Sequence, residues 1–443
     1  MITDTGARFV PSVLMAIDTV TSSLVTIILL SCFAASARAS PRTWQPLVVT
    51  GAQLPRELGA RENRIEIIAF KDGRITPIPF QIDKRRADGR YVMPNGPNPV
   101  ADDHPGKLHN DDELVMMLAD MGTRVPATQY LASGTLEIKT VDPLDGQARY
   151  AYIAAVDAPL RSSVHYLYYD RAADRIETTF YRIGLTDGWP TEFALQHQIH
   201  GDAPNLIDRF KVRTSATILQ LFSYRMNEND IHNRLLAWKV GPVRMLRLES
   251  HSVNLLLGIH SPHVQSQVFM YRNYMENPTR INFPWMPRLV LDNLKLRLDV
   301  DYFNLNGFQL TWSAMRTPPL VIGSNSPEER KLEHGPTGPP IRWLALRGDD
   351  RLLMQALRPS RDFDLLQLSL YYRNSSVPDP PEKYPGEHPG IGYVIGGYQN
   401  LGRGIHIFDS LFVIAPATYQ ATTLIHELGS SPSVTVTPFV KGK

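Results

Sequence analysis

The feature that most constrains this chain is the strict alternation of apolar and polar residues over residues 294–302 (LKLRLDVDY). Leucine, valine and tyrosine occupy every second position, and lysine, arginine and aspartate fill the positions between them. A period of two is that of a β-strand, whose successive side chains point to opposite faces of a sheet. Because all the charges fall on one face, we expect a strand with one face in a core and the other in water.

Many other segments have the composition of strands, whereas helical patterns are scarce. A hairpin is expected over residues 165–182, with its turn at or near residues 170–174. Two segments, 111–119 and 204–209, are long enough for a turn or two of helix, and no stretch shows a sustained helical stripe. The other expected strands are residues 64–70, 136–138, 150–156, 243–248, 268–271, 366–372, 393–395 and 405–414.

Strands that follow one another without intervening helices predict a mainly β protein. We expect antiparallel sheets in a β-sandwich or a larger stack of sheets, with long Pro- and Gly-rich loops and few short helices. A domain boundary is placed after Ala158. Residues 40–158 are predicted to form an N-terminal β-sandwich-like domain. Residues 159–443 are predicted to form a larger antiparallel β domain with a long loop at 316–340.

The N-terminus has the features of an export signal. Residues 24–35 form a continuous apolar run that is too short for a membrane span but suits the core of a signal peptide. An Ala-Arg-Ala site ending at Ala39 follows it. Residues 1–39 are therefore predicted to be a signal peptide cleaved before Ser40, which predicts a periplasmic or secreted protein. No later stretch is apolar enough to be a transmembrane span.

Two alternatives to this cleavage stay open. Residues 29–32 (LLSC) resemble a lipobox, so a lipoprotein anchored through Cys32 is the first alternative. An uncleaved anchor, or translation that starts at Met15, is the second.

Cysteine content and charge exclude several classes of protein. Cys32 is the single cysteine, so cleavage after Ala39 would leave no disulfide, no thiolate nucleophile and no cysteine-bound metal. The 46 Lys and Arg residues nearly balance the 44 Asp and Glu residues. This balance gives no general electrostatic reason to expect nucleic-acid binding.

An acidic stretch at residues 100–114 is the densest group of oxygen ligands. Asp102, Asp103, Asp111 and Asp112 are candidates for a calcium site, and calcium is the one cofactor that the sequence suggests. Their spacing is not that of an EF-hand. The alternative, which we favour, is a solvated loop in which an acidic residue caps a short helix.

A resemblance to a known group appears around this loop. Residues 79–83 read PFQID, residues 89–92 read GRYV, and residues 111–122 read DDELVMMLADMG. This order is similar to that of uncharacterised exported bacterial β-rich proteins, in which a PFQ-D strand precedes a polar loop and a DELVFMA-D-G segment. The resemblance covers roughly residues 77–122. It implies export and a β fold, and it implies no functional residue.

No contiguous catalytic motif is present. Two histidine pairs, His197 with His200 and His260 with His263, have a spacing that suits a metal only on a helix, and we favour ordinary surface histidines. The G-x-S-x-G elbow is absent. A Ser-His-Asp triad assembled from distant residues stays open, because triads are defined by geometry.

Aromatic residues suggest a surface for sugars. Sugar rings stack on flat aromatic side chains, so a sheet face rich in tyrosine and tryptophan is a candidate glycan platform. We favour the alternative, in which these rings fill the core. The aromatic candidates are residues 269–274 and 283–285 with Tyr371, Tyr372, Tyr384, Tyr393 and Tyr398, and the carboxylates that suit acid–base work beside them are Asp299, Asp301 and Glu276.

Two functional hypotheses follow. The first is an exported envelope protein that binds a glycan or a protein partner without catalysis. The second is a carbohydrate-active enzyme, similar to a polysaccharide lyase, on a β-sandwich scaffold. The first is favoured because no catalytic motif stands out.

Overall fold

The computed structural model describes residues 42, 44–218, 221–253, 264–283, 291–315, 318–333, 340–348, 350–358, 364–374 and 390–440. Residues 42–443 form one compact unit. The predicted signal peptide, Cys32, His260, His263 and Tyr384 lie outside the described residues.

The predicted fold class is confirmed, because the described residues form five antiparallel sheets. Two of them make a small sandwich with its own apolar core. One has three strands in the order β1 (Pro46–Thr50), β5 (Glu113–Met117) and β4 (Phe80–Asp83). The other has five strands in the order β26 (Ser433–Pro438), β6 (Leu136–Val141), β7 (Ala148–Ala155), β2 (Ile65–Lys71) and β3 (Arg74–Pro77).

The largest sheet has nine strands, and both of its faces are covered. Their order is β14 (Ile231–Val240), β15 (Arg244–Val253), β16 (Val264–Tyr271), β17 (Tyr274–Phe283), β25 (Gly404–Pro416), β22 (Arg351–Leu357), β21 (Trp343–Arg347), β19 (Gln309–Trp312) and β20 (Leu320–Val321). One face contacts β5 and helix α4 (Ala421–Gly429). The other face packs on two further sheets and forms the main core.

These two further sheets complete the layers. The four-stranded sheet has the order β11 (Trp189–Leu195), β10 (Tyr181–Thr186), β9 (Arg175–Thr178) and β8 (Leu167–Asp170). The five-stranded sheet has the order β13 (Phe222–Met226), β12 (Ile207–Ile218), β18 (Leu291–Tyr302), β24 (Gly390–Gly396) and β23 (Gln367–Arg373). Strands β8 and β9 form the expected hairpin.

Helices are short in the described part of the chain. Besides α4, there is α2 (Pro327–Glu333), which lies with β20 inside the predicted long loop 316–340. Single 3-10 turns occur at Gly51–Gln53, Glu62–Arg64, Leu118–Asp120, Glu228–Asp230 and Tyr398–Asn400. None of the described helices has the length and apolar character needed to span a membrane.

Both expected helical segments are wrong, and β5 shows the reason. Leu114 and Met116 point into the core of the small sandwich. Val115 and Met117 point the other way, into the core between β5 and the nine-stranded sheet. A strand buried on both faces has no alternation, so its sequence cannot be told from a buried helical turn by periodicity. The second segment, 204–209, leads into β12.

Strand β18 corrects the expectation for residues 294–302. It lies between β12 and β24, and its charged face is buried in its second half: Asp299 and Asp301 are 1% and 2% exposed, whereas Lys295 is exposed. Lys211 on β12 lies 2.6 Å from Asp301, and Arg297 donates to Asp299 at 2.9 Å. The prediction of a face in water is wrong for these two aspartates, which lie beside Arg297 and Lys211 within the sheet.

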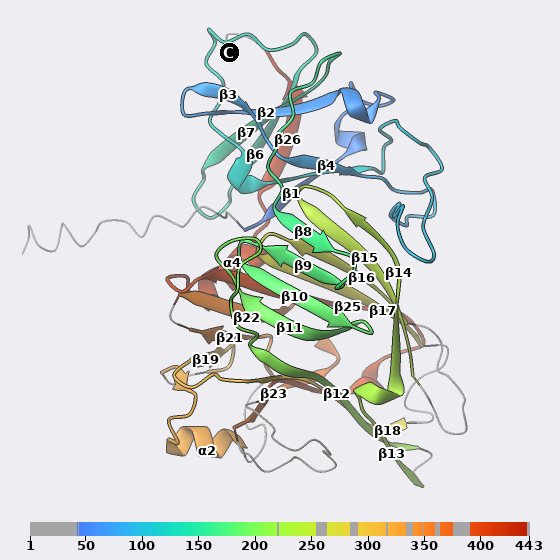
Figure 1. The fold of residues 1–443 in the computed structure, drawn as a ribbon, viewed down its shortest axis with the longest axis vertical. Coiled ribbons are helices and arrows are strands. Elements are labelled where there is room, and N and C mark those ends of the chain that lie inside the picture. The colour runs from blue at the N-terminus through green and yellow to red at the C-terminus, as the bar shows by residue number, and fades with distance from the viewer. Residues whose placement is uncertain are drawn as a thin grey trace, which may run out of the picture. The chain divides into compact units, whose positions relative to one another are not determined.

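The last described strand belongs to the five-stranded sheet of the small sandwich. Strand β26, at the red end of the colour scale, pairs with β6 among the blue and teal strands of the small sandwich (Figure 1). The predicted N-terminal domain therefore includes residues 433–438. The boundary after Ala158 itself stays a prediction.

A buried charge cluster joins the small sandwich to the nine-stranded sheet. Arg244 on β15 donates to Asp83 Oδ2, Glu113 Oε2 and Tyr271 Oη, each at 2.7 Å. Gln81 accepts the backbone N–H of Arg244 at 2.8 Å. We call Gln81, Asp83, Glu113, Lys239, Arg244 and Tyr271 the Arg244 cluster. The conspicuous residues of the PFQID and DDELV segments thus have a structural role here.

Candidate functional site

A cavity of about 330 Å³ lies between the nine-stranded sheet and the two sheets that cover it. Its walls come from β10 and β11, from β12, β18 and β24, and from six strands of the nine-stranded sheet. This volume is that of a site for a small molecule. Most of its lining is apolar, as the interior of a sandwich requires.

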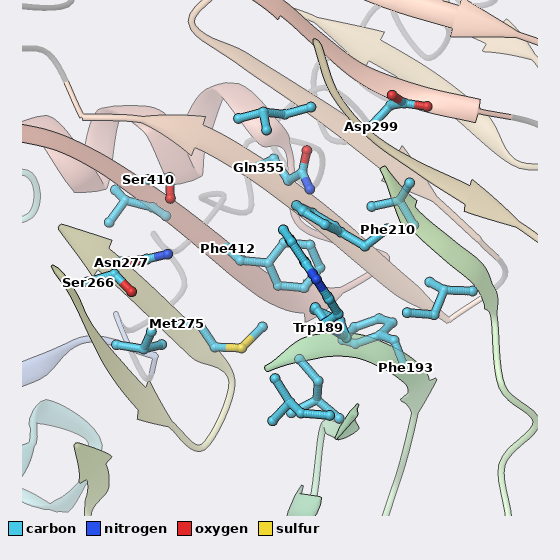
Figure 2. A pocket seen from close by; sticks show the side chains of 18 of the residues that line it. Trp189, Phe193, Phe210, Ser266, Met275, Asn277, Asp299, Gln355, Ser410 and Phe412 are labelled. Carbon is cyan, nitrogen blue, oxygen red and sulfur yellow. The ribbon is translucent and has the colours of Figure 1, made fainter. Parts of the chain in front are cut away.

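Aromatic side chains form one wall of the cavity. Trp189 on β11 is stacked on Phe210 of β12, with ring centroids 5.7 Å apart and planes at 27°. Phe193 meets Phe412 edge to face at 5.4 Å. Figure 2 shows these four rings grouped together, with Ser266, Asn277 and Ser410 to one side of them. Flat apolar surfaces of this kind favour a ring or chain as the ligand body.

Polar side chains from six neighbouring strands face the cavity on the nine-stranded sheet. Each strand from β14 to β22 in the sheet order contributes one uncharged side chain, and β15 also contributes Glu249, which is paired with Arg247. Asn233 is paired with His251 in the strand register, and Asn277 with Ser410. We call this set the polar row; its members are Asn233, His251, Ser266, Asn277, Ser410 and Gln355.

His251 lies near the end of the polar row and is held by both ring nitrogens. Its Nδ1 is 2.6 Å from Asn233 Oδ1, and its Nε2 is 2.6 Å from Ser266 Oγ. Burial lowers the pKa of His251, and the carboxylate of Glu249 opposes this effect. Burial therefore favours the neutral imidazole, which can donate from one nitrogen and accept at the other.

Two amide atoms of the polar row have no hydrogen-bond partner among the described residues. They are Asn233 Nδ2 and Asn277 Oδ1, and both are buried. Buried polar atoms in native proteins are nearly always satisfied, so such atoms call for an explanation. A ligand in the cavity would supply the missing partners.

The interior of the nine-stranded sheet is irregular beside these residues. Strand β17 contains Pro278, which has no N–H to donate to a neighbouring strand. The recorded pairing of β16 with β17 passes from Ser266–Thr279 to Phe269–Glu276 and skips the two positions between. Proline is rare within central strands, and here it interrupts the ladder beside Asn277.

The four calcium candidates are not brought together around an open position. Asp112 is fully buried and lies 3.0 Å from Lys84 Nζ, and Asp102 lies 3.8 Å from the same ammonium. Asp103 accepts from His104, and Asp111 is exposed. Lys84 thus provides the positive charge near two of these carboxylates. In the part of the chain that the structure describes, no three acidic, His or Cys side chains form a metal-binding group. Calcium binding stays a prediction.

The described histidine pair is on loops and is divided between partners. His197 lies 2.8 Å from Asp350, whereas His200 lies 3.0 Å from Glu177. Both imidazoles are more than half exposed. This arrangement is that of ordinary surface histidines, as favoured above.

The described aromatic candidates for a glycan platform are mainly core residues. Those that are buried include Phe269, Tyr271, Tyr274, Tyr372, Tyr393 and Tyr398. Tyr371 is half-buried beneath the Arg297 guanidinium, 4.3 Å from the ring centroid. These residues therefore fill the layers between sheets, as the favoured alternative predicts.

The three candidate carboxylates are separated by the sheets. Asp299 and Asp301 are held in the ion pairs of β18, although Asp299 also borders the cavity. Burial raises the pKa of Asp299 to about 7, against the charge of Arg297. Glu276 lies on the opposite face of the nine-stranded sheet from Asn277 and accepts from Tyr274 and Arg358. The structure does not assemble them into one acid–base pair.

Sequence reasoning missed every member of the polar row. Asn233, His251 and Ser266 stand on three strands, and only the register of those strands brings them together. A weak signal is Ser410, a polar residue just before the apolar run LFVIAP of β25. Asn277 lies in the mainly polar strand YMENPTRINF and gives no such signal. A triad assembled from distant residues is a hypothesis that the sequence leaves open without indicating its residues.

Comparisons with known proteins find a distant structural similarity and no related sequence. No protein-family model matches the sequence, and no curated protein matches it. Among solved structures, the chain is similar to an alpha-mannosidase from Enterococcus faecalis V583, with 10% identity and a TM-score of 0.48. The match covers 90% of this chain and 45% of that one, so the chain spans less than half of that protein. We draw no functional argument from this similarity.

Proposed function

We propose that the protein binds a small molecule in the cavity between its sheets, and that this ligand has an apolar body and a polar edge. The observation that carries the proposal is the polar row beside the aromatic wall, with Asn233 Nδ2 and Asn277 Oδ1 buried and without partners among the described residues. A ligand edge that donates to Asn277 and accepts from Asn233 satisfies both atoms. Its body displaces water from Trp189 and Phe210, which is favourable for apolar surface.

This proposal refines the hypothesis of glycan binding. A sugar ring also has apolar and polar faces, but its hydroxyl groups need partners on nearly every side. The mainly apolar lining of the cavity supplies most such partners along the nine-stranded sheet, with Asp299 of β18 on the covering sheet. A ligand with one or two polar groups fits the lining better than a free sugar. Export to the periplasm or beyond remains part of the proposal, and N-terminal sequencing of the mature protein is expected to begin at Ser40.

Titration with 1-naphthol, a fused apolar ring with one hydroxyl group, tests the proposal. We expect quenching of tryptophan fluorescence that saturates, and no comparable change with glucose. Asn277→Ala should weaken binding about tenfold, because one buried hydrogen bond is lost. Asn282→Ala is the matched control, since Asn282 is exposed on the same strand.

A second variant asks whether the ligand occupies the cavity itself. Val268 lines the cavity beside Ser266, and Val268→Phe fills part of it. Binding should then be lost while the protein stays folded by circular dichroism. Quenching by 1-naphthol that survives both Val268→Phe and Asn277→Ala would place the ligand elsewhere and end the proposal. If glucose bound saturably and 1-naphthol did not bind, the ligand would be a sugar and not a molecule with an apolar body.

A further inference from the structure

Three residues of the polar row have the geometry of a nucleophile, its base and a residue that orients the base. Ser266 Oγ lies 2.6 Å from His251 Nε2, and His251 Nδ1 lies 2.6 Å from Asn233 Oδ1. The residues stand on the adjacent strands β16, β15 and β14. The structure assigns to this end of the cavity a Ser266–His251–Asn233 acyl-transfer site that hydrolyses esters with an apolar body.

The hydrogen bonds determine which imidazole nitrogen is the base. Asn233 Oδ1 can only accept, so His251 Nδ1 carries the proton and donates to it. In the neutral ring, Nε2 then has the lone pair and accepts from the Ser266 hydroxyl. This is the tautomer that a general base needs, with Asn233 as a positioning residue. Burial lowers the pKa of His251 and so favours this neutral ring.

The surroundings provide for the other parts of the reaction. The cavity adjoins Ser266 and accommodates an apolar acyl or alcohol group against the aromatic wall. Thr279 is the register partner of Ser266, and Asn277 is one diagonal step away on the same face. Of these two, Asn277 lines the cavity, and we assign its amide N–H as the donor to the carbonyl oxygen as negative charge develops there.

The reaction balances with water as the second substrate. Ser266 Oγ attacks the ester carbonyl while His251 Nε2 takes the hydroxyl proton. The bond to the alcohol oxygen breaks, the alcohol leaves with that proton, and the acyl group stays on Oγ. Water then attacks the acyl carbon, His251 accepts its proton and returns it to Oγ, and the carboxylic acid is released. No oxidant or reductant is needed.

The alternative is that the three side chains form a hydrogen-bonded ladder that only fills the sheet. Labelling separates the two, because a structural serine does not react with a fluorophosphonate. We expect such a probe to modify the full chain at the peptide that contains Ser266, and the protein to hydrolyse 4-nitrophenyl butyrate. Ser266→Ala should remove both signals, and His251→Gln should lower both rates about 100-fold or more.

Two controls make the labelling specific. Ser250→Ala removes a buried serine from the neighbouring strand β15, where it faces the other side of the sheet, and should change neither signal. Modification of Ser410 or Ser250 in place of Ser266 would overturn the assignment. Folding of each variant is checked by circular dichroism, and a Ser266→Ala protein that folds and still hydrolyses the ester at the wild-type rate would also overturn it.

The role of Asn233 has its own test. The charged groups on the His251 side of this region are Glu249 on the same strand and Arg247, which pairs with Asp174. The facing residues of β14 and β16 are uncharged, and Asp299 of β18, whose pKa burial raises to about 7, borders the same cavity. Asn233→Asp puts a carboxylate on Nδ1–H, which stabilises the imidazolium and should move the rise of activity to higher pH by about one unit. An unmoved profile would show that Asn233 does not act through His251.

The inference rests on the proposed binding function, and its failure can be told apart from the failure of that function. 4-Nitrophenyl butyl ether has the shape of the ester but cannot be cleaved by acyl transfer. If the ether quenches tryptophan fluorescence while the fluorophosphonate and the ester do not react, the cavity binds ligands and the catalytic assignment is wrong. If the ether does not bind and the ester is not cleaved, both proposals fail.

Discussion

Two buried polar clusters of this protein differ in how completely they are satisfied. In the Arg244 cluster every charged group has an opposite charge within hydrogen-bond distance, and among the described residues none of its buried side-chain atoms lacks a partner. In the polar row the groups are uncharged, and two amide atoms are unpartnered. The first cluster lies between two apolar cores, whereas the second borders a cavity. Complete satisfaction indicates a role in holding layers together, and incomplete satisfaction beside a cavity indicates a ligand.

The largest effect is expected from breaking the Arg244 cluster. Arg244→Met leaves Asp83 and Glu113 without their main partner, and the free energy of unfolding should fall by about 3–5 kcal/mol. Burial alone would raise the pKa of Asp83, and the charges of Arg244 and Lys239 hold it below its usual value. Denaturant unfolding measures the loss, with Arg403→Met, at an exposed position, as control. A loss under about 1 kcal/mol would show that the cluster does not stabilise the layers.

Asp299 gives a smaller effect that depends on pH. Burial raises its pKa to about 7, so between about pH 4 and 7 the folded protein keeps a proton that the unfolded chain has released. Stability from this group therefore falls as the pH rises through that window. Asp299→Asn should be more stable than the wild type by on the order of 2 kcal/mol at pH 8.5 and about equal at pH 4.5.

The measurement of stability against pH needs a control at an aspartate that is exposed to solvent. Asp208→Asn replaces an exposed aspartate on the adjacent strand β12 and should give no pH-dependent difference. A stability difference between Asp299→Asn and the wild type that is the same at both pH values would mean that Asp299 is ionised throughout. The arrangement at β18 would then resemble the Arg244 cluster.

Replacing a polar side chain by an apolar one should stabilise the protein in the polar row, whereas it should destabilise the protein in the Arg244 cluster. Asn277→Leu removes a buried atom without a partner and adds apolar contact, so the unliganded protein should gain about 1 kcal/mol. Asn282→Leu on the exposed part of the same strand should change little. A loss above about 1 kcal/mol for Asn277→Leu would show that the row stabilises the sheet by itself.

The smallest effect concerns the calcium prediction. Lys84 is 6% exposed and provides the cation beside Asp102 and Asp112, so millimolar calcium should raise the wild-type melting temperature by about 1 °C or less. Lys84→Met leaves these carboxylates without the ammonium, and calcium should then restore part of the lost stability. Lys107→Met, at an exposed position, is the control. A large calcium shift in the wild type would mean that a site exists beside Lys84.

The positions of many strands could be predicted from the sequence, but what each face of a strand contacts could not. Alternation or β-branched residues located β2, β7, β16, β18 and β25, because the period of two depends on each strand alone. Whether the charged face of β18 meets water depends on Lys211, which is far away in the sequence but paired through the register of β12. The alternation of a strand does not contain that information.

The candidate site could not be predicted from local sequence patterns for the same reason. Its polar atoms come from six strands, each with one inconspicuous residue, and its aromatic wall comes from β11, β12 and β25. The motifs that did stand out, PFQID and DDELV, hold layers together through Gln81, Asp83 and Glu113. Conspicuous local segments thus marked the junction of the layers, and dispersed residues marked the cavity.

The pairing of β26 with β6 sets the order of events during synthesis. The Ser433 hydroxyl donates to the Val141 carbonyl, 292 residues earlier in the chain. A ribosome therefore completes all of β1 to β25 before β26 can cover the edge of this five-stranded sheet. Until then β6 presents unpaired N–H and C=O groups, which other chains can use for pairing. A chain that ends early keeps this edge open, so loss of the last few residues should promote aggregation or degradation of the whole protein.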